Sequence, residues 1–326
     1  MLMRPNIILH GGAGRWSRSK YADKAREVVM KCTEKGMNIL RNNGSAIDAV
    51  VEAVKCMEDS GYLNAGVGSV LDFMGGRSLD AGVMDGATGR IGAVASVTAT
   101  RNPVVLARIV MEKTDHHLIG GKGADLLAFL NGLPPLPPPP PHVWERYQEA
   151  VRKLLEGEPE VYRKITRFLE DYGFIKRIIE ETLDVGDTVG AVAVDSQGRL
   201  AAAVSTGGVI LKFPGRIGDS PIPGAGFYAS AYTACSATGI GEKIMECMTC
   251  KYLDTMYRET KDLIAAAEKT LEYVNKAVGE NTMGFIAIDR NGEIVWAYNT
   301  EAMLIGYCED DNIKALIKPP RTLRLS

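Results

Sequence analysis

A proline cluster near the middle of the chain divides the sequence into two halves. Seven of the fifteen prolines lie between Pro134 and Pro141. Such a run cannot enter a helix interior or a central strand, because proline has no backbone N–H and its φ angle is fixed. Residues 132–187, which continue as charged sequence, are therefore predicted to be a connector. Within it, the apolar spacing of residues 144–155 and 161–183 indicates helices.

The first half is predicted to contain a strand and two helices. Residues 6–10 are a short apolar strand, and the glycine-rich residues 11–14 are expected to turn the chain. An apolar face with helical spacing then runs to Gly44. Ser45, with Asp48 three residues later, resembles a capping box that opens a second helix. Both helices can cover one sheet.

The second half contains two similar strand pairs. Residues 189–195 and 200–205 flank a Ser-Gln-Gly turn, and residues 285–289 and 294–298 flank an Asn-Gly turn. These turn residues suit positive φ, so each pair is a predicted β-hairpin. Helices are predicted near residues 240–257 and 263–278. Hairpins with helices grouped beside them favour an α+β architecture of stacked antiparallel sheets over a βαβ array.

Charge and composition exclude several classes of partner. The chain has 38 basic and 40 acidic residues, a formal net charge of -2, and so lacks the basic footprint of a nucleic-acid-binding or membrane-binding protein. No apolar run approaches the roughly 18 residues that span a bilayer, and the N-terminal stretch is too short for a signal peptide. A small neutral or zwitterionic partner and a cytoplasmic location are expected.

The cysteines are predicted to be buried thiols rather than a disulfide framework, because they are scattered through a chain expected in the cytosol. They are Cys32, Cys56, Cys235, Cys247, Cys250 and Cys308. Cys247 and Cys250 form the one CxxC pair. No second pair completes a zinc site, so core packing is favoured over metal or redox chemistry.

Thr188 stands where the connector ends and the second half begins, in the segment GDTVGAVA (186–193). A threonine hydroxyl is a weak nucleophile without a base. Cleavage of the peptide bond before Thr188 would supply that base as a new α-amine, whose ordinary pKa is about 7.7 to 8.0. The alternative is that Thr188 is only a β-branched residue at the start of a strand.

Three further segments carry side chains that suit such a site. Thr206 closes the first hairpin and is expected beside the nucleophile. Arg216 and Asp219 lie on a loop framed by glycine and proline and can bind the carboxylate and the ammonium of an amino acid, although a local surface ion pair would also explain them. Thr238 and Gly239 precede a helix and can donate to an oxyanion, although Thr238 could be a plain N-cap.

With these segments the sequence resembles the plant-type asparaginases and isoaspartyl peptidases, a family of N-terminal-nucleophile hydrolases. The resemblance covers nearly the whole chain outside the connector. The matching segments are IILHGGAG (7–14), YLNAGVGSVL (62–71), LDAGVMDGATGRIGAVASV (79–97), RNPVVLARIVMEKTDHHLIG (101–120), DTVGAVAVDSQGRLAAAVSTGG (187–208), PGRIGDSPIPGAGFYA (214–229) and ATGIGE (237–242).

The resemblance implies a four-layer αββα sandwich of two stacked, mainly antiparallel sheets. It implies self-cleavage into an α subunit (1–187) and a β subunit (188–326) that form one domain, and hydrolysis of L-asparagine or β-aspartyl dipeptides. The implied site consists of the cleavage residues Asp187 and Thr188, the nucleophile Thr188 with its supporting hydroxyl Thr206, the substrate-binding Arg216, Asp219 and Asn64, and the oxyanion-binding Thr238 and Gly239, the last of which also contacts substrate.

The same resemblance implies a homodimer of cleaved protomers and no cofactor for catalysis. It also implies a structural sodium ion held by main-chain carbonyls. The implied ligands are the carbonyls of Met57, Glu58, Ser60, Leu63, Ala65 and Val67.

Two other functions stay open. Many family members have glycine before the nucleophile, whereas Asp187 stands here, as in the related glycosylasparaginases; the HGGAG segment (10–14) instead favours the asparaginase branch. The chain could also be a non-cleaving amino-acid-binding or scaffold protein. For His10, a structural role at the end of a strand is favoured over a role as a base. The glycines that follow lack dinucleotide-binding spacing.

Overall fold

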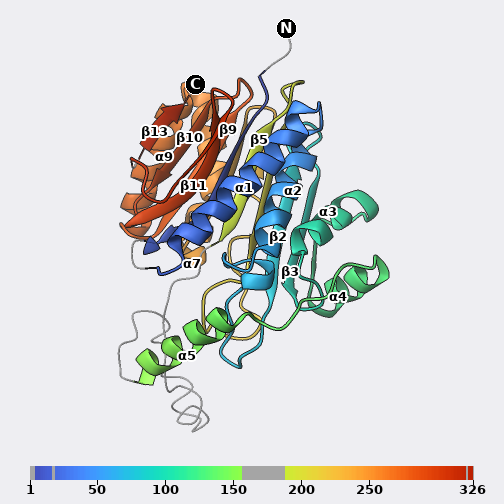
Figure 1. Ribbon diagram of the computed structural model, residues 1–326. Helices are drawn as coiled ribbons and strands as arrows, with labels where there is room; N and C mark the ends of the chain where they lie inside the picture. The colour runs from blue at the N-terminus through green and yellow to red at the C-terminus, as the bar shows by residue number, and fades with distance from the viewer. Residues whose placement is uncertain (1–3, 17–18, 156–187, 321, 326) are drawn as a thin grey trace.

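The computed structural model describes residues 4–16, 19–155, 188–320 and 322–325, which form two stacked sheets and their covering helices (Figure 1). The helices are α1 (Ala22–Arg41), α2 (Ala46–Asp59), the 3-10 helix η2 (Gly66–Gly68), α3 (Pro103–Lys113), α4 (Gly121–Leu130), α5 (Pro141–Leu155), α7 (Gly241–Cys247), α8 (Thr249–Thr260) and α9 (Leu263–Val278). The strands are β1 (Asn6–Gly14), β2 (Leu79–Asp85), β3 (Ile91–Val97), β4 (Leu118–Gly120), β5 (Val189–Val194), β6 (Leu200–Thr206), β7 (Phe227–Ala229), β8 (Thr233–Gly239), β9 (Met283–Asp289), β10 (Ile294–Tyr298), β11 (Ala302–Glu309), β12 (Asn312–Leu316) and β13 (Thr322–Leu325).

The larger sheet contains strands from before and after the connector, and β1, from before it, lies between two groups of strands from after it. Its order is β12-β11-β1-β5-β6-β2-β3-β4, and the smaller sheet has the order β13-β10-β9-β8-β7. Within these sheets β3 and β4 pair in parallel, and the other pairs are antiparallel. The hairpin β5-β6 lies between β1 and β2, so the two halves of the sequence complete one sheet.

Three apolar cores separate four layers. One core lies between the larger sheet and α1, α2 and α3, a second lies between the sheets, and a third lies between the smaller sheet and α7, α8 and α9. Strand β5 is buried on both faces: Ala191 points into the helix-covered core and Val192 into the core between the sheets. In Figure 1, α1 and α2 cross one side of the assembly and α9 lies on the other. The predicted α+β sandwich of four layers is confirmed.

The local predictions hold in part. Ser45 caps α2 by accepting a hydrogen bond from the Asp48 N–H at 3.2 Å. The glycines after His10, however, do not turn the chain. Strand β1 continues through Gly14 with a bulge between His10 and Gly12, because a glycine with a φ of 121° allows the strand to kink and still pair with β11.

The helix predicted over residues 240–257 is also corrected. It is two helices, α7 and α8, that meet at Met248, whose φ of 49° cannot continue either one. The helix predicted over residues 144–155 is confirmed as α5, which begins at Pro141; proline is favoured at the first position of a helix, where the N–H has no intrahelical acceptor. The predicted helix over residues 161–183 lies outside the described residues. Every described helix is too short or too polar to cross a membrane.

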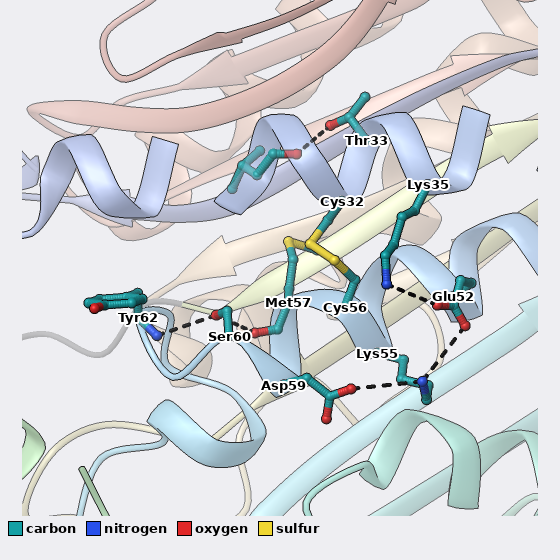
Figure 2. Close-up of a disulfide and its surroundings, with 11 residues drawn as sticks. Cys32, Thr33, Lys35, Glu52, Lys55, Cys56, Met57, Asp59, Ser60 and Tyr62 are labelled. Carbon is teal, nitrogen blue, oxygen red and sulfur yellow. Dashed lines mark hydrogen bonds and ion pairs between the residues drawn. A yellow bond between two sulfur atoms is a disulfide. The ribbon is translucent and has the colours of Figure 1, made fainter. Parts of the chain in front are cut away.

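A disulfide joins α1 to α2, which corrects the prediction that all six cysteines are free. Cys32 and Cys56 are bonded, with their Cα atoms 5.6 Å apart (Figure 2). Both residues lie on the apolar stripes with which the two helices pack together. Scattered spacing could not reveal this pairing, because it depends on how the helices pack. The other four cysteines are buried thiols, as predicted.

Candidate active site

The β5-β6 hairpin brings two threonine hydroxyls together. Register pairs Val189 with Ser205, which leaves Thr188 and Thr206 opposite each other at the open end of the hairpin. Thr188 Oγ1 donates to Thr206 Oγ1 at 3.2 Å. Both residues are buried, so the hydroxyl pair lies in a medium where hydrogen bonds and charges interact strongly. Asp187 lies outside the described residues.

His10 fixes the main chain of Thr188. Its Nδ1 lies 3.1 Å from the Thr188 carbonyl and its Nε2 lies 2.8 Å from Ser236 Oγ. Because a carbonyl only accepts, Nδ1 carries the proton and the Ser236 hydroxyl donates to Nε2. Complete burial lowers the pKa of His10 to about 3, so the ring is neutral. His10 therefore has the structural role that the sequence predicted, although it lies within β1 at the bulge and not at the end of the strand.

Thr238 and Gly239 end β8 beside the nucleophile. The Thr238 hydroxyl is fully buried and donates to the Thr188 carbonyl at 3.5 Å. The cap position of the following helix is Ile240, so the reading of Thr238 as an N-cap is wrong. Gly239 has a φ of 140°, and a Cβ there would lie 2.3 Å from the Thr282 carbonyl oxygen. Only glycine can end the strand in this way.

Asn64 ties the loop after α2 to the turn that follows Thr206. Its Nδ2 donates to the Gly208 carbonyl at 2.6 Å, and its Oδ1 accepts from the Val70 N–H at 2.9 Å. The Gly208 N–H in turn donates to Thr206 Oγ1 at 2.9 Å. Asn64 thus contributes to the site by holding the turn that orients the supporting hydroxyl.

Arg216 forms an ion pair that the sequence analysis missed. Its Nε and Nη2 donate to the two carboxylate oxygens of Glu242, at 2.9 and 2.8 Å. Glu242 lies in the first turn of α7, where its charge also suits the helix N-terminus. Burial opposes ionisation, yet the hydrogen bonds and charge of Arg216 lower the pKa of Glu242. A separation of 26 residues left no local signal for this contact.

Asp219 is a buried carboxyl group with one oxygen that accepts no hydrogen bond within the described residues. Among the described residues, no group donates a hydrogen bond to its Oδ2, and the residue is 4% exposed. Burial raises the pKa of Asp219 to about 7, although the charge of Arg216 opposes the shift. A Cβ on Gly241 would lie 2.8 Å from both Asp219 Oδ1 and Arg216 Nη2. The two side chains therefore converge just beyond the end of β8, where Thr238 and Gly239 lie.

Main-chain carbonyls crowd the loop that carries Asn64. A Cβ on Gly66 would lie 2.6 Å from the Glu58 carbonyl oxygen, and one on Gly68 would lie 2.4 Å from that of Leu63. The side chain of Glu58 is used elsewhere: its carboxyl accepts from the Val104 N–H at 3.0 Å, and burial raises its pKa to about 8. The Glu58 carboxyl is thus engaged with the first turn of α3, and the Glu58 group that faces the loop is its main-chain carbonyl.

Comparison with known proteins identifies the family of the chain. The family model described as "Asparaginase" matches residues 3–317. The plant-type L-asparaginase of Pyrobaculum calidifontis is 43% identical, over 95% of this chain and 98% of its own length. That of Pyrococcus horikoshii is 40% identical, over 93% and 96%, and the isoaspartyl peptidase of Escherichia coli is 38% identical, over 91% and 90%. The chain belongs to the asparaginase family.

Proposed function

We propose that the chain hydrolyses the side-chain amide of L-asparagine or of a β-aspartyl dipeptide, with Thr188 as the nucleophile. The contact between the Thr188 and Thr206 hydroxyls carries this proposal. Thr188 is buried, it follows the connector directly, and Thr206 is the hydrogen-bond partner of its hydroxyl. The test is to incubate the purified protein with L-asparagine and to measure ammonia and aspartate. Release of neither product, from asparagine or a β-aspartyl dipeptide, would contradict it.

The first stage of the proposed mechanism is self-cleavage. Thr188 Oγ attacks the carbonyl carbon of Asp187, the C–N bond between the two residues breaks, and the acyl group passes to the oxygen as an ester. Water then hydrolyses that ester. The products are residues 1–187 with a new carboxylate and residues 188–326 with a free threonine amine. His10 and Thr238 support this stage by holding the Thr188 carbonyl.

The second stage acts on substrate. The neutral Thr188 amine accepts the hydroxyl proton while Oγ attacks the β-carbonyl, and Thr206 holds the hydroxyl in place. Thr238 and the Gly239 N–H are suited to stabilise the oxyanion. The proton passes to the leaving amine, ammonia or an amino acid departs, and water releases aspartate from the ester.

Substrate binding is assigned to Asp219 and Arg216, which would take the α-ammonium and the α-carboxylate. Because Asp219 must be ionised to attract an ammonium, its pKa of about 7 predicts a pH-dependent KM. We expect KM for L-asparagine to rise by about tenfold for each pH unit below 7 and to be level above it. Steady-state kinetics between pH 5 and 9 measure this. A KM that stays constant down to pH 5 would show that Asp219 does not bind the ammonium.

Loss of the Arg216 side chain should weaken the binding of substrate. In Arg216→Ala the substrate carboxylate loses a charged hydrogen-bonding partner, and Glu242 is left to repel it, so KM should rise by roughly 100-fold while self-cleavage continues. Arg90→Ala, which removes an exposed arginine, is the matched control. Mass spectrometry reports cleavage and kinetics report KM. Unchanged kinetics on asparagine would remove Arg216 from the site.

Two rival functions are separated by simple assays. A glycosylasparaginase-like activity, suggested by Asp187, would require turnover of glycosyl-asparagine in preference to asparagine. A non-cleaving scaffold would keep a single intact mass after prolonged incubation and would release no ammonia.

We also propose the structural sodium ion, a homodimer of cleaved protomers and a cytoplasmic location. The crowding of loop carbonyls around Gly66 and Gly68 supports the sodium ion, which would stiffen the loop that carries Asn64 and supply no chemistry. The dimer rests on the family resemblance alone. A cytoplasmic location requires the Cys32–Cys56 bond to persist where disulfides are rare, and its burial between α1 and α2 would shield it from reductants.

A further inference from the structure

A lysine is completely buried beneath the proposed substrate site. Lys212 is 0% exposed, and its Nζ donates to the Ser78 carbonyl at 2.8 Å. An ammonium ion has three donors and is costly to remove from water. Burial lowers the pKa of Lys212, and the charge of Asp80 opposes that shift. A neutral side chain could fill this volume without the free-energy cost of removing a charge from water. A role that depends on the charge of Lys212 would account for its presence.

The ammonium of Lys212 and the guanidinium of Arg216 both lie close to Gly208. A Cβ on Gly208 would lie 3.0 Å from Lys212 Nζ and 3.4 Å from Arg216 Nη1. Gly208 has a φ of 80° and belongs to the turn whose N–H donates to Thr206 Oγ1. The absence of a side chain here lets two cations approach one face of the turn that adjoins the hydroxyl pair.

The surrounding charges determine what a substrate carboxylate would meet. Glu242 neutralises Arg216 through a bidentate ion pair, so that pair alone offers little net attraction. Asp80 faces Lys212 from strand β2, and Asp72 faces it from the loop before that strand. Burial raises the pKa of Asp80, and its Oδ2 has no hydrogen-bond donor among the described residues. Its other carboxylate oxygen, Oδ1, accepts from the Ser96 N–H at 2.8 Å, so neither oxygen is hydrogen-bonded to Lys212, and Asp80 offsets that ammonium less closely than Glu242 offsets Arg216.

We propose that Lys212 is a positioning residue whose buried charge makes the site selective for substrates with a free, ionised α-carboxylate. This inference rests on the proposed function, since it assigns Arg216 to the carboxylate. Lys212 restores the positive potential that Glu242 removes, and it acts through the buried medium that it shares with Arg216 rather than by touching substrate. An α-amide or a peptide bond at that position would gain nothing from it.

The alternative role for Lys212 is mechanical, because its hydrogen bond to Ser78 joins the substrate loop to the start of β2. Two variants separate charge from hydrogen bonding. Lys212→Gln retains a donor and loses the charge, whereas Lys212→Arg retains the charge. Lys122→Met, which removes an exposed lysine on α4, is the control for net charge.

The experiment measures the binding of L-aspartate and of its α-amide to each self-cleaved protein by calorimetry. We expect Lys212→Gln to bind L-aspartate about tenfold or more weakly and the α-amide within about twofold of the unmodified protein. Lys212→Arg should restore most of the preference, and Lys122→Met should change nothing.

Three outcomes would overturn the inference: equal weakening for both ligands, no weakening for either, or failure of both Lys212 variants to fold, which would make the residue structural. Binding needs no turnover, so this test is distinguishable from failure of the proposed function. If the unmodified protein binds L-aspartate but hydrolyses no amide, the hydrolase proposal fails while the selectivity of Lys212 is still measured.

Discussion

A chain carrying Thr188→Ala is expected to remain a single polypeptide of 326 residues and to lose L-asparagine hydrolysis by about 10⁴-fold or more. The reason is that one hydroxyl serves both stages. Its loss prevents the attack on the Asp187 carbonyl, so the α-amine that would act as base never forms, and the nucleophile for substrate is absent as well. Intact-mass spectrometry and ammonia release measure the two losses on one sample.

Two controls make this result specific. Thr188→Ser keeps the hydroxyl and should still cleave and turn over substrate. Thr270→Ala removes another buried threonine hydroxyl, one that donates to a carbonyl within α9 at 2.7 Å, and should affect neither stage. A Thr188→Ala chain that still splits before residue 188, or that retains amide hydrolysis, would show that the nucleophile lies elsewhere.

The parts of the site that sequence could predict are those set by local rules. Thr188 and Thr206 meet because period-two alternation and a short turn determine the register of a hairpin. The Ser45 cap is local in the same way, because it depends only on Ser45 and on Asp48 three residues later. His10 could be judged structural because a histidine in a buried apolar segment beside glycines has main-chain groups to bond, although the strand continues beyond it.

Contacts between distant segments escaped prediction. The ion pair between Arg216 and Glu242 depends on how the loop after β6 and the start of α7 meet, which no spacing encodes. The burial of Lys212 and the joining of Cys32 to Cys56 likewise follow from packing. The glycines after His10 suggested a turn because glycine permits positive φ, but pairing with β11 turns that freedom into a bulge within one long strand.

Reduction of the Cys32–Cys56 disulfide is expected to lower the free energy of unfolding by about 3 kcal/mol. The bond closes a segment with a sequence separation of 24, and the entropy that such a closure removes from the unfolded chain corresponds to about that value. In Figure 2 the bond lies between α1 and α2, just before the turn at Ser60. The measurement is urea unfolding of the Thr188→Ala chain, with and without reductant, so that a single polypeptide unfolds in each case.

The double variant Cys32→Ala with Cys56→Ala is the matched control. It should be less stable than its parent in oxidising buffer and insensitive to reductant, since the four remaining cysteines are free thiols. If mass spectrometry shows that the parent has gained two hydrogens while its unfolding curve stays in place, the bond does not stabilise the fold. A loss confined to the parent would instead show that the link between α1 and α2 stabilises the fold, whose helical layer covers β5, the strand that begins beside the nucleophile.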